Sequence, residues 1–246
     1  TPGLAERALD CGWGPDPLTL FCPRCGATTG PFEAGASGCS ACRAKRLRWQ
    51  SACRVGEYRG LLRDAIHEVK FQPWRRLGTE LGVVLGRQLQ GPLAAAGVDP
   101  DRLVLVPMPT SLLRRLTRGI HHTLAIARGV RMVTGGRIVH VLRRAHRPSQ
   151  VSLSQTDRLR NVAGSMRRRR GLALAGHTVV VIDDVMTTGA TMKEACRALI
   201  EGTAGPGQLP QSVWAAVLAV ATDPERRPAN TRTINDGTEP GAEDRI

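Results

Sequence analysis

The chain has 246 residues, 41% of them hydrophobic but only 3% aromatic, and its formal net charge is +14. This length suits one domain with an aliphatic core plus a small module. No apolar run reaches the ~18 residues that a membrane helix needs, and the first residues lack the pattern of a secretory signal peptide. We therefore predict no membrane insertion and a cytoplasmic protein.

The positive charge is concentrated in the middle of the chain. Between Thr110 and Arg170 there are fifteen arginines and a single acid, Asp157. A segment this basic favours a polyanionic partner or a highly phosphorylated ligand. The simpler interpretation is a solvated, arginine-rich surface.

Two Cys-x-x-Cys pairs lie within residues 1–54, which we predict to form a zinc-knuckle module. Thirteen residues separate the inner cysteines, a spacing close to that of four-thiolate zinc sites. Gly26, directly after the first pair, allows the left-handed backbone that such a knuckle favours. Four thiolates form a closed, structural site, whereas the alternative, a disulfide framework, suits secreted mini-domains better. The predicted Zn²⁺ ligands are Cys22, Cys25, Cys39 and Cys42; Cys11 and Cys53 are free, or one of them substitutes as a ligand.

From residue 58 onward, helical and strand patterns alternate. Apolar residues recur at helical spacing from Leu61 to Val69, from Leu77 to Leu89 and from Ile120 to Val130, which predicts three helices. Alternating strands and helices indicate an α/β domain with a parallel sheet, which we place at residues 55–221. The polar tail 222–246 is expected to be disordered. The predicted strands are 103–106, 138–142, 179–182 and 213–220.

The stretch 179–191, V-V-V-I-D-D-V-M-T-T-G-A-T, is the most informative part of the chain. Four apolar residues suit a strand buried on both faces, and Asp183 and Asp184 stand where we expect it to end. The uncharged loop Thr187-Thr188-Gly189-Ala190-Thr191 then leads into a helix that we expect over Met192–Glu201. Backbone N–H groups and hydroxyls there are donors for a phosphate, and the two acids can accept sugar hydroxyls or bind a divalent cation.

Two other interpretations of this stretch fail on the rest of the sequence. The acidic strand of a P-loop NTPase requires G-x-x-x-x-G-K-[ST] elsewhere, but none of the three lysines, Lys45, Lys70 and Lys193, follows a glycine. A receiver domain would require a full doubly wound domain downstream, and the remaining chain is too short.

The stretch resembles the phosphoribosyl-pyrophosphate (PRPP) motif of type I phosphoribosyltransferases. The resemblance implies the α/β fold of that class, in which a parallel sheet is flanked by helices. It also implies that Asp183 and Asp184 hold the ribose 2′- and 3′-hydroxyls, and that Mg²⁺ accompanies a PRPP or ribose 5-phosphate-type ligand. The residues implied to wrap the 5′-phosphate are Thr187, Thr188, Gly189, Ala190 and Thr191.

With the four-cysteine module added, residues 20–221 resemble the ComF/GntX family. Further matching segments are Tyr58-Arg-Gly-Leu-Leu-Arg, Val69-Lys70-Phe71, Val106-Pro-Met-Pro109 and Asp157-Arg-Leu-Arg-Asn161. The chain departs from the family pattern at Ile120-His121-His122 and at Ser152, in segments expected to meet the pyrophosphate and the incoming group. We expect the two histidines to be solvated or structural rather than a metal pair, because adjacent helical residues face different ways.

The ComF/GntX resemblance implies a role in DNA uptake during natural competence, with single-stranded DNA and a helicase-like ATPase as partners. The sequence leaves enzymatic turnover open. Alternatives are a non-enzymatic nucleic-acid-associated protein that uses the basic middle segment, and a zinc-stabilised interaction module without a ligand. Arginines can clamp pyrophosphate bidentately; the candidates are Arg114, Arg115 and Arg118, while Arg143, Arg144 and Arg147 could close over the site.

Overall fold

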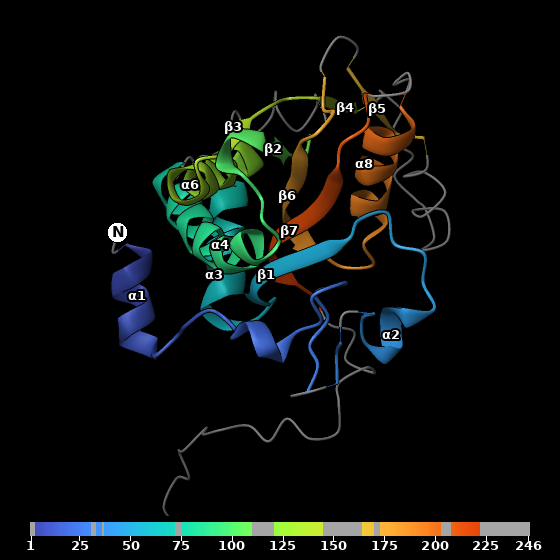
Figure 1. Ribbon diagram of the computed structural model, residues 1–246. Helices are drawn as coiled ribbons and strands as arrows, with labels where there is room; N and C mark the ends of the chain where they lie inside the picture. Colours follow the sequence, from blue (N-terminus) through green and yellow to red (C-terminus); the bar gives the residue numbers. More distant parts are fainter. Residues whose placement is uncertain are drawn as a thin grey trace, which may run out of the picture.

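A five-stranded parallel sheet with the strand order β1-β7-β6-β2-β3 runs through the centre of the protein (Figure 1). This confirms the predicted α/β class with a parallel sheet. The computed structural model describes residues 3–30, 33–35, 37–71, 75–109, 121–144, 164–169, 173–202 and 208–221. The strands are β1 (Ser51–Glu57), β2 (Leu103–Pro107), β3 (Arg137–Ile138), β6 (Thr178–Met186) and β7 (Ser212–Val220).

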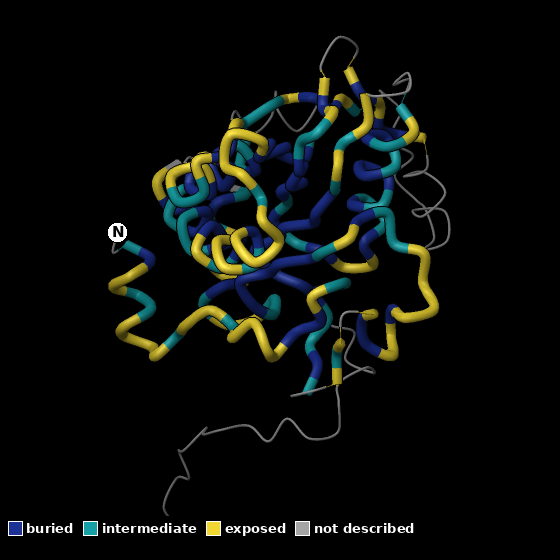
Figure 2. The backbone as a smooth tube through the Cα atoms, in the orientation of Figure 1, coloured by how far each residue is buried: buried dark blue, intermediate teal, exposed yellow. Residues whose placement is uncertain are grey.

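Helices cover both faces of the sheet, which explains why β6 is apolar on both sides. Val180 and Ile182 belong to one hydrophobic core, under α3, α4 and α6, and Val179 and Val181 belong to a second core, under α8. The central strands are accordingly buried along most of their length (Figure 2). The helices are α3 (Gly60–Phe71), α4 (Arg75–Ala95), α6 (His122–Thr134) and α8 (Ala190–Glu201).

A short antiparallel ribbon of β4 (Leu142–Arg144) and β5 (Met166–Arg168) lies outside the main sheet. The predicted single strand over 138–142 is therefore wrong. Its first residue ends β3, which pairs with β2, and its last begins β4, which pairs with β5. The sequence stays apolar between the end of β3 and the start of β4 because Val141 and Leu142 are buried in the core under α8.

The N-terminal residues pack against α3 and α4. In α1 (Leu4–Cys11), the Leu4 amide donates to Glu80 at 2.8 Å, and Arg7 pairs with Glu68 at 2.9 Å. The predicted boundary at residue 54 falls inside β1, whose residues 51–57 pair with β7. The division into a module at 1–54 and a domain at 55–221 stays a prediction, and the predicted tail 222–246 lies outside the described residues.

Candidate functional site

Strand β6 leads directly into the predicted phosphate loop. Thr187 and Thr188 are exposed, and α8 begins at Ala190. Gly189, the N-cap of α8, has a φ of 73°, a left-handed conformation that a side chain would strain. The first turn of a helix has backbone N–H groups without intrahelical partners. The turn therefore presents donors at the carboxyl end of the sheet, where phosphates bind to other helix starts.

The two aspartates lie inside β6 rather than after it, so the predicted end of that strand is wrong. Pairing with β7 continues through Met186, which is opposite Val220. Asp184 is buried, and its Oδ2 lies 3.2 Å from Nζ of Lys70 and 2.9 Å from Nε2 of His122. Lys70 of α3 thus places a positive charge beside this carboxylate, and His122 of α6 contacts the same oxygen.

The pKa values of the two carboxyl groups are shifted in opposite directions. Burial, together with the charge of Asp184, raises the pKa of Asp183 to about 8. Burial also opposes ionisation of Asp184, but the hydrogen bond from His122 and the charge of Lys70 outweigh it and lower its pKa. Near neutral pH the pair therefore carries one negative charge rather than two.

Sequence reasoning missed the part that Lys70 and His122 play here. We expected both histidines to be solvated or structural, and this stays a prediction. His122 contacts Asp184 at the site, and His121 lies beside His140, with 6.4 Å between ring centroids. One feature of the sequence could have drawn attention to Lys70: it is one of only three lysines among the 35 basic residues of the chain.

The four predicted metal ligands form one cluster. Sulfur atoms of Cys22 and Cys42, and of Cys25 and Cys39, are 3.7 Å apart, and all four sulfurs lie within 4.8 Å of one another. Four sulfurs placed tetrahedrally at 2.3 Å from a zinc ion would be separated by about 3.8 Å, whereas a disulfide needs about 2 Å. The cluster therefore fits a four-thiolate metal site and not a pair of disulfides.

Local contacts affect these thiols unequally: the hydrogen bond with Cys22, together with burial, raises the pKa of Cys25, and burial raises the pKa of Cys42, whereas the thiolate is favoured at Cys22. Hydrogen bonding with Cys25, helped by backbone N–H groups, lowers the pKa of Cys22 to about 4 against the opposing effect of burial. A thiolate is the form that binds metal. Gly26 has a φ of 74°, as predicted for the turn after the first pair. Cys53 is buried in the core beneath the helices and Cys11 is exposed, both outside the cluster.

Two arginines tie the cysteine knuckle, which we define as residues 21–45, to itself and to the sheet. The guanidinium of Arg24 donates to the carbonyl oxygens of Ser37, Cys42, Arg43 and Lys45 at 3.0–3.3 Å. Arg54 of β1 is fully buried, and it donates to Gly26 O at 2.9 Å and to Asp16 at 2.6 Å. A buried guanidinium needs such partners. Because Arg54 has them, the segment Ser51–Glu57 can form a buried strand although it contains this charged residue.

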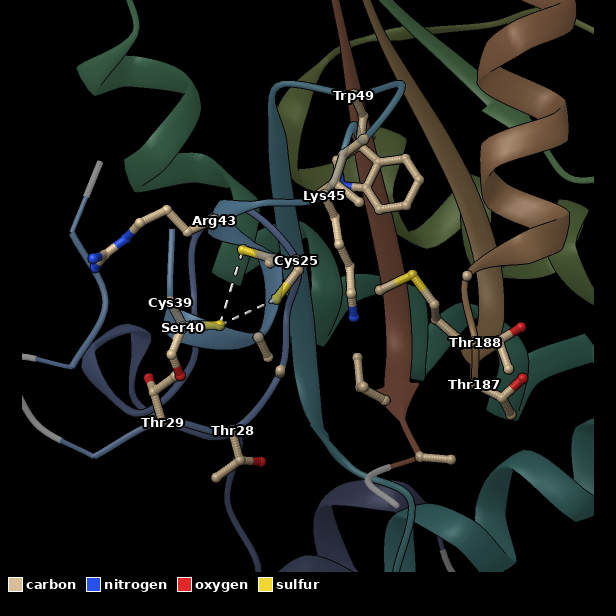
Figure 3. Close-up of a pocket in the computed structure, with 18 of the residues that line it drawn as sticks. Cys25, Thr28, Thr29, Cys39, Ser40, Arg43, Lys45, Trp49, Thr187 and Thr188 are labelled. Atoms are coloured by element: carbon tan, nitrogen blue, oxygen red, sulfur yellow. Dashed lines mark hydrogen bonds between the residues drawn. The ribbon is translucent and has the colours of Figure 1, made fainter. Parts of the chain in front are cut away.

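A cavity of about 1080 Å³ separates the cysteine knuckle from the phosphate loop. Figure 3 shows the knuckle on one side, with Cys25 and Cys39, and Thr187 and Thr188 on the other. Nothing in the sequence analysis brought these two motifs together. Two groups of residues line the cavity. From the knuckle and the segment after it come Cys25, Ala27–Thr29, Glu33, Cys39–Arg43, Lys45, Leu47 and Trp49. From the sheet domain come Met186–Gly189, Lys193 and Val220–Ala221.

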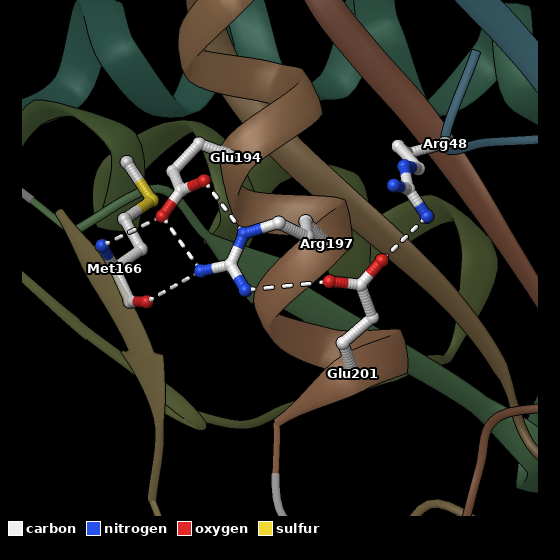
Figure 4. Close-up of polar contacts among 5 residues, drawn as sticks. All are labelled: Arg48, Met166, Glu194, Arg197 and Glu201. Carbon is white, nitrogen blue, oxygen red and sulfur yellow. Dashed lines mark hydrogen bonds and ion pairs between the residues drawn. The ribbon is translucent and has the colours of Figure 1, made fainter. Parts of the chain in front are cut away.

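An ion-pair network on α8 holds the surrounding pieces together (Figure 4). Glu194 is buried, accepts from the Met166 amide of β5 at 3.2 Å, and pairs with Arg197 at 2.8 Å. Glu201 pairs with Arg197 at 3.4 Å and with Arg48, which follows the knuckle, at 2.6 Å. The helix behind the phosphate loop thus connects the β4–β5 ribbon and the knuckle.

The structure describes only part of the basic middle segment. Arg143 and Arg167 are exposed and directly opposite each other in the β4–β5 ribbon. Arg168 is buried and donates to Gln208 O at 3.2 Å, so not every arginine in the run that begins at Arg167 is exposed. The predicted pyrophosphate ligands Arg114, Arg115 and Arg118, and also Arg147, lie outside the described residues.

Residues 108–236 match the family described as the phosphoribosyl transferase domain. This match covers more than half of the chain, which therefore belongs to that family. The chain is also similar to the DNA utilization protein YhgH of Escherichia coli (strain K12), with 28% identity over 197 residues, and of Salmonella typhimurium (strain LT2), with 27% over 200 residues. Each alignment covers 77% of this chain and 82% of the relative. These matches confirm the predicted relationship to ComF/GntX-type proteins.

Solved structures show a more distant likeness. The structure of an allosteric regulatory enzyme of purine biosynthesis is similar, with a TM-score of 0.38 and 18% identity. The likeness covers 62% of this chain but only 30% of that protein, so this chain spans less than a third of its length. Among the described residues, no helix combines the length and hydropathy that crossing a membrane requires.

Proposed function

We propose that the protein binds a ribose 5-phosphate-type ligand, such as PRPP, at the carboxyl end of β6. The observation that carries this proposal is an uncharged, hydroxyl-bearing turn at a helix start, placed directly after two carboxylates in a parallel sheet. The residues Thr187, Thr188, Gly189, Ala190 and Thr191 would hold the 5′-phosphate through backbone N–H and hydroxyl donors. Asp183 and Asp184 would accept hydrogen bonds from the ribose hydroxyls.

The same carboxylates fit Mg²⁺, which proteins bind through one or two carboxylates together with the phosphates of a substrate. When bound, Mg²⁺ would neutralise part of the pyrophosphate charge. Asp183 and Asp184 supply the protein oxygens for it, and Arg114, Arg115 and Arg118 are the proposed pyrophosphate ligands. Lys70 and His122 already keep Asp184 ionised before a ligand arrives.

For the cysteine cluster we propose one structural Zn²⁺, held by Cys22, Cys25, Cys39 and Cys42. Sulfur separations of 3.7–3.9 Å support this assignment, because they match the edges of a ZnS₄ tetrahedron. With four thiolates the site has no open position for a substrate, so its role would be to hold the two Cys-x-x-Cys halves of the knuckle together.

Phosphoribosyl transfer is the reaction to assay. In that reaction the bond between ribose C1 and pyrophosphate breaks, and an acceptor nucleophile takes the ribose. The loop and the two aspartates would hold the ribose, and arginines would neutralise the leaving pyrophosphate. None of the described residues is assigned as a base for the acceptor, so binding without turnover is the other form of the same proposal.

A second function is supported by the relatives, which are named as DNA utilization proteins. We propose that this protein binds single-stranded DNA through its basic surface, in a cytoplasmic role in DNA uptake during natural competence with a helicase-like ATPase as partner. The exposed Arg143 and Arg167 of the β4–β5 ribbon support a phosphate-binding face. If there is neither DNA nor ribose phosphate binding, the zinc-stabilised interaction module is the remaining alternative.

Isothermal titration with PRPP, in the presence and absence of Mg²⁺, tests the first proposal. We expect binding that requires Mg²⁺ and is lost in the Asp183→Asn/Asp184→Asn double variant, because each charge-assisted contact is worth about 1.5–3 kcal/mol. Asp64→Asn is the matched control, since Asp64 is an exposed residue of α3 whose ion pair with Arg63 is 3.9 Å long. Equal affinity in the wild type and the double variant would overturn the proposal.

A further inference from the structure

The carboxylate of Asp184 is held by donors from three elements, α3, α6 and its own strand β6. Its Oδ2 atom lies 3.2 Å from the ammonium of Lys70 and 2.9 Å from Nε2 of His122. Its Oδ1 atom accepts the backbone amide of Val185 at 2.6 Å. A carboxylate oxygen has about two acceptor positions, so Oδ2 is filled and Oδ1 keeps one for a ribose hydroxyl. The carboxylate therefore has a fixed orientation before a ligand binds.

Lys70 keeps hydrogen-bond donors that His122 does not. Because a carboxylate oxygen only accepts, the Nε2 proton of His122 is used in its contact with Asp184. An ammonium group has three donors, so one contact with Asp184 leaves two on Lys70. The Lys70 side chain is also 24% exposed, which leaves it open to solvent beside the carboxylate. Lys70 can therefore donate to Asp184 and to a bound ligand at the same time.

The position of Lys70 follows from the packing of α3. Ile66 and Val69 are buried in the same core as Ile182 of β6. Lys70 is the next residue, one before the end of the helix at its last turn. Asp184 lies two residues beyond Ile182, on the same face of the strand. The helix thus places the ammonium at the carboxyl end of the sheet, where we propose that the ribose binds.

The chemistry of PRPP places its pyrophosphate on the side of these carboxylates. In PRPP the pyrophosphate on ribose C1 lies on the same face of the ring as the 2′- and 3′-hydroxyls. A ribose whose hydroxyls contact Asp183 and Asp184 therefore turns the pyrophosphate toward a pair that carries negative charge. Like charges repel at such distances unless cations lie close to them. Ribose 5-phosphate has a hydroxyl at C1 and does not meet this repulsion.

Fixed positive charge of the protein lies on both sides of the acid pair. Lys70 contacts Asp184 from α3. The pKa of Asp183 is raised chiefly by burial, and the charges of Lys70 and of Arg144 from β4 act against this rise. Mg²⁺ would add to this charge when it binds. Of these cations, Lys70 is held against a carboxylate proposed to bind the ribose, so its ammonium is placed to meet a group on C1.

We propose that Lys70 is a specificity-determining residue of this site, which selects a ligand with pyrophosphate on ribose C1 over one with a hydroxyl there. The inference rests on the proposed function of the loop and the two aspartates, and it adds the class of ligand. Lys70 donates to a pyrophosphate oxygen, and its charge offsets that of Asp184 toward the same group. Asp184 has the further role of positioning Lys70.

Isothermal titration with PRPP and with ribose 5-phosphate, at one Mg²⁺ concentration, tests this assignment. The measured quantity is the ratio of the two dissociation constants, and we expect the wild type to bind PRPP more tightly. Lys70→Gln should weaken PRPP binding about tenfold, the effect of one charge-assisted hydrogen bond, and change ribose 5-phosphate binding little. Lys70→Arg retains the charge and should retain most of the preference for PRPP.

The matched control is Arg63→Gln, which removes one positive charge from the same helix. Arg63 is exposed, and its ion pair with Asp64 is 3.9 Å long. Any general attraction between a basic protein and a polyanionic ligand changes equally in Arg63→Gln and Lys70→Gln. We therefore expect Arg63→Gln to leave the ratio of dissociation constants unchanged.

The proposal is overturned if the wild type binds PRPP and ribose 5-phosphate equally. It is also overturned if Lys70→Gln weakens both ligands by the same factor, because Lys70 then acts only by holding Asp184 for the ribose. A ratio in Arg63→Gln or in Lys70→Arg as low as that of Lys70→Gln contradicts it as well. In each case ribose 5-phosphate can still bind, and only the role of Lys70 fails. A wild type that binds neither ligand contradicts the proposed function itself.

Discussion

The phosphate loop and the cysteine knuckle face each other across one cavity, but they are held in place by different means. The loop continues from β6 into α8, both of which are buried in the core of the sheet domain. The knuckle's own buried cluster consists of Cys22, Cys39 and Cys42. Its other connections include hydrogen bonds from Arg24 and Arg54, from the Trp49 indole to the Arg24 carbonyl, and from the Ala52 amide to the Pro23 carbonyl. The loop therefore has its shape before any ligand binds, whereas the knuckle relies on these hydrogen bonds and, as we propose, on a zinc ion.

Removing one metal ligand should give the largest effect and test this difference directly. We expect the wild type to contain about one zinc ion per chain, and Cys25→Ser to lose it and expose residues 20–45 to proteolysis, since structural zinc contributes about 10–16 kcal/mol to small zinc modules. Thermal unfolding of the sheet domain should change little. Metal analysis and limited proteolysis are the measurements, with Cys11→Ser as the control. Absence of zinc, with the thiols oxidised in pairs, would contradict the assignment.

The second test breaks the link between the knuckle and the sheet. Arg54→Met removes a buried charge whose partners are Asp16, Thr28 and the Gly26 carbonyl. We expect it to lower the free energy of unfolding by about 3 kcal/mol, because Asp16 loses its partner. Urea denaturation measures the change, and Arg54→Met/Asp16→Asn should recover part of it. No recovery in the double variant would show that the ion pair is not the cause.

A third test concerns the site at β6, where pH should change stability through Asp183. Its pKa is about 8 in the folded protein, against an ordinary value of 3.8. Between these values the unfolded chain has lost a proton that the folded protein retains, so the free energy of unfolding falls as pH rises from 4 to 8. Asp183→Asn should remove this contribution. Denaturation at pH 5 and at pH 8 gives the free energies of unfolding of the wild type and of Asp183→Asn, and their difference should change between the two pH values. The same difference at both pH values would contradict the prediction.

Changing the glycine of the loop should have a smaller effect. Gly189→Ala places a side chain at a φ of 73°, where its nearest neighbour outside the turn is the Trp49 ring at 3.5 Å. Because there is room for the methyl group, only backbone strain of about 1 kcal/mol is expected. Thermal unfolding measures this strain. A loss much greater than that of Gly91→Ala, in an open stretch of α4, would be attributed to the turn, and no difference would contradict the argument.

The smallest effect is expected at the basic surface. Arg167→Gln/Arg169→Gln removes two exposed charges of the β4–β5 region, and it should weaken single-stranded DNA binding and reduce its salt dependence by about two charges. Arg168 is left unchanged because it is buried. Anisotropy titrations over a range of salt concentrations measure both quantities. If the dependence of DNA affinity on salt concentration is unchanged, these two arginines do not contact DNA and belong to an ordinary solvated surface.

The sequence predicted the parts of this molecule that depend on local order. The run from Val179 to Thr191 contains the strand, the acids and the loop in sequence, so its placement could be predicted without distant contacts. Strand β1 could not be predicted in this way, because Arg54 and Gly56 interrupt its apolar pattern and its burial depends on pairing with β7. The contact of His122 with Asp184 could not be predicted either, because it joins residues far apart in the chain. For the same reason the sequence did not predict the cavity, whose two walls come from distant segments.

The position of β1 also has a consequence for how the chain is made. In the sheet, β1 is an edge strand whose one neighbour is β7, the last strand along the described chain. A ribosome releases Ser51–Glu57 long before Ser212–Val220, so the edge that carries the knuckle has no template during most of translation. Strand β1 must therefore wait unpaired until β7 emerges, and until then the knuckle would depend on the zinc ion that we propose for it. A chain terminated before residue 212 would leave β1 without its partner, however complete the preceding helices and strands were.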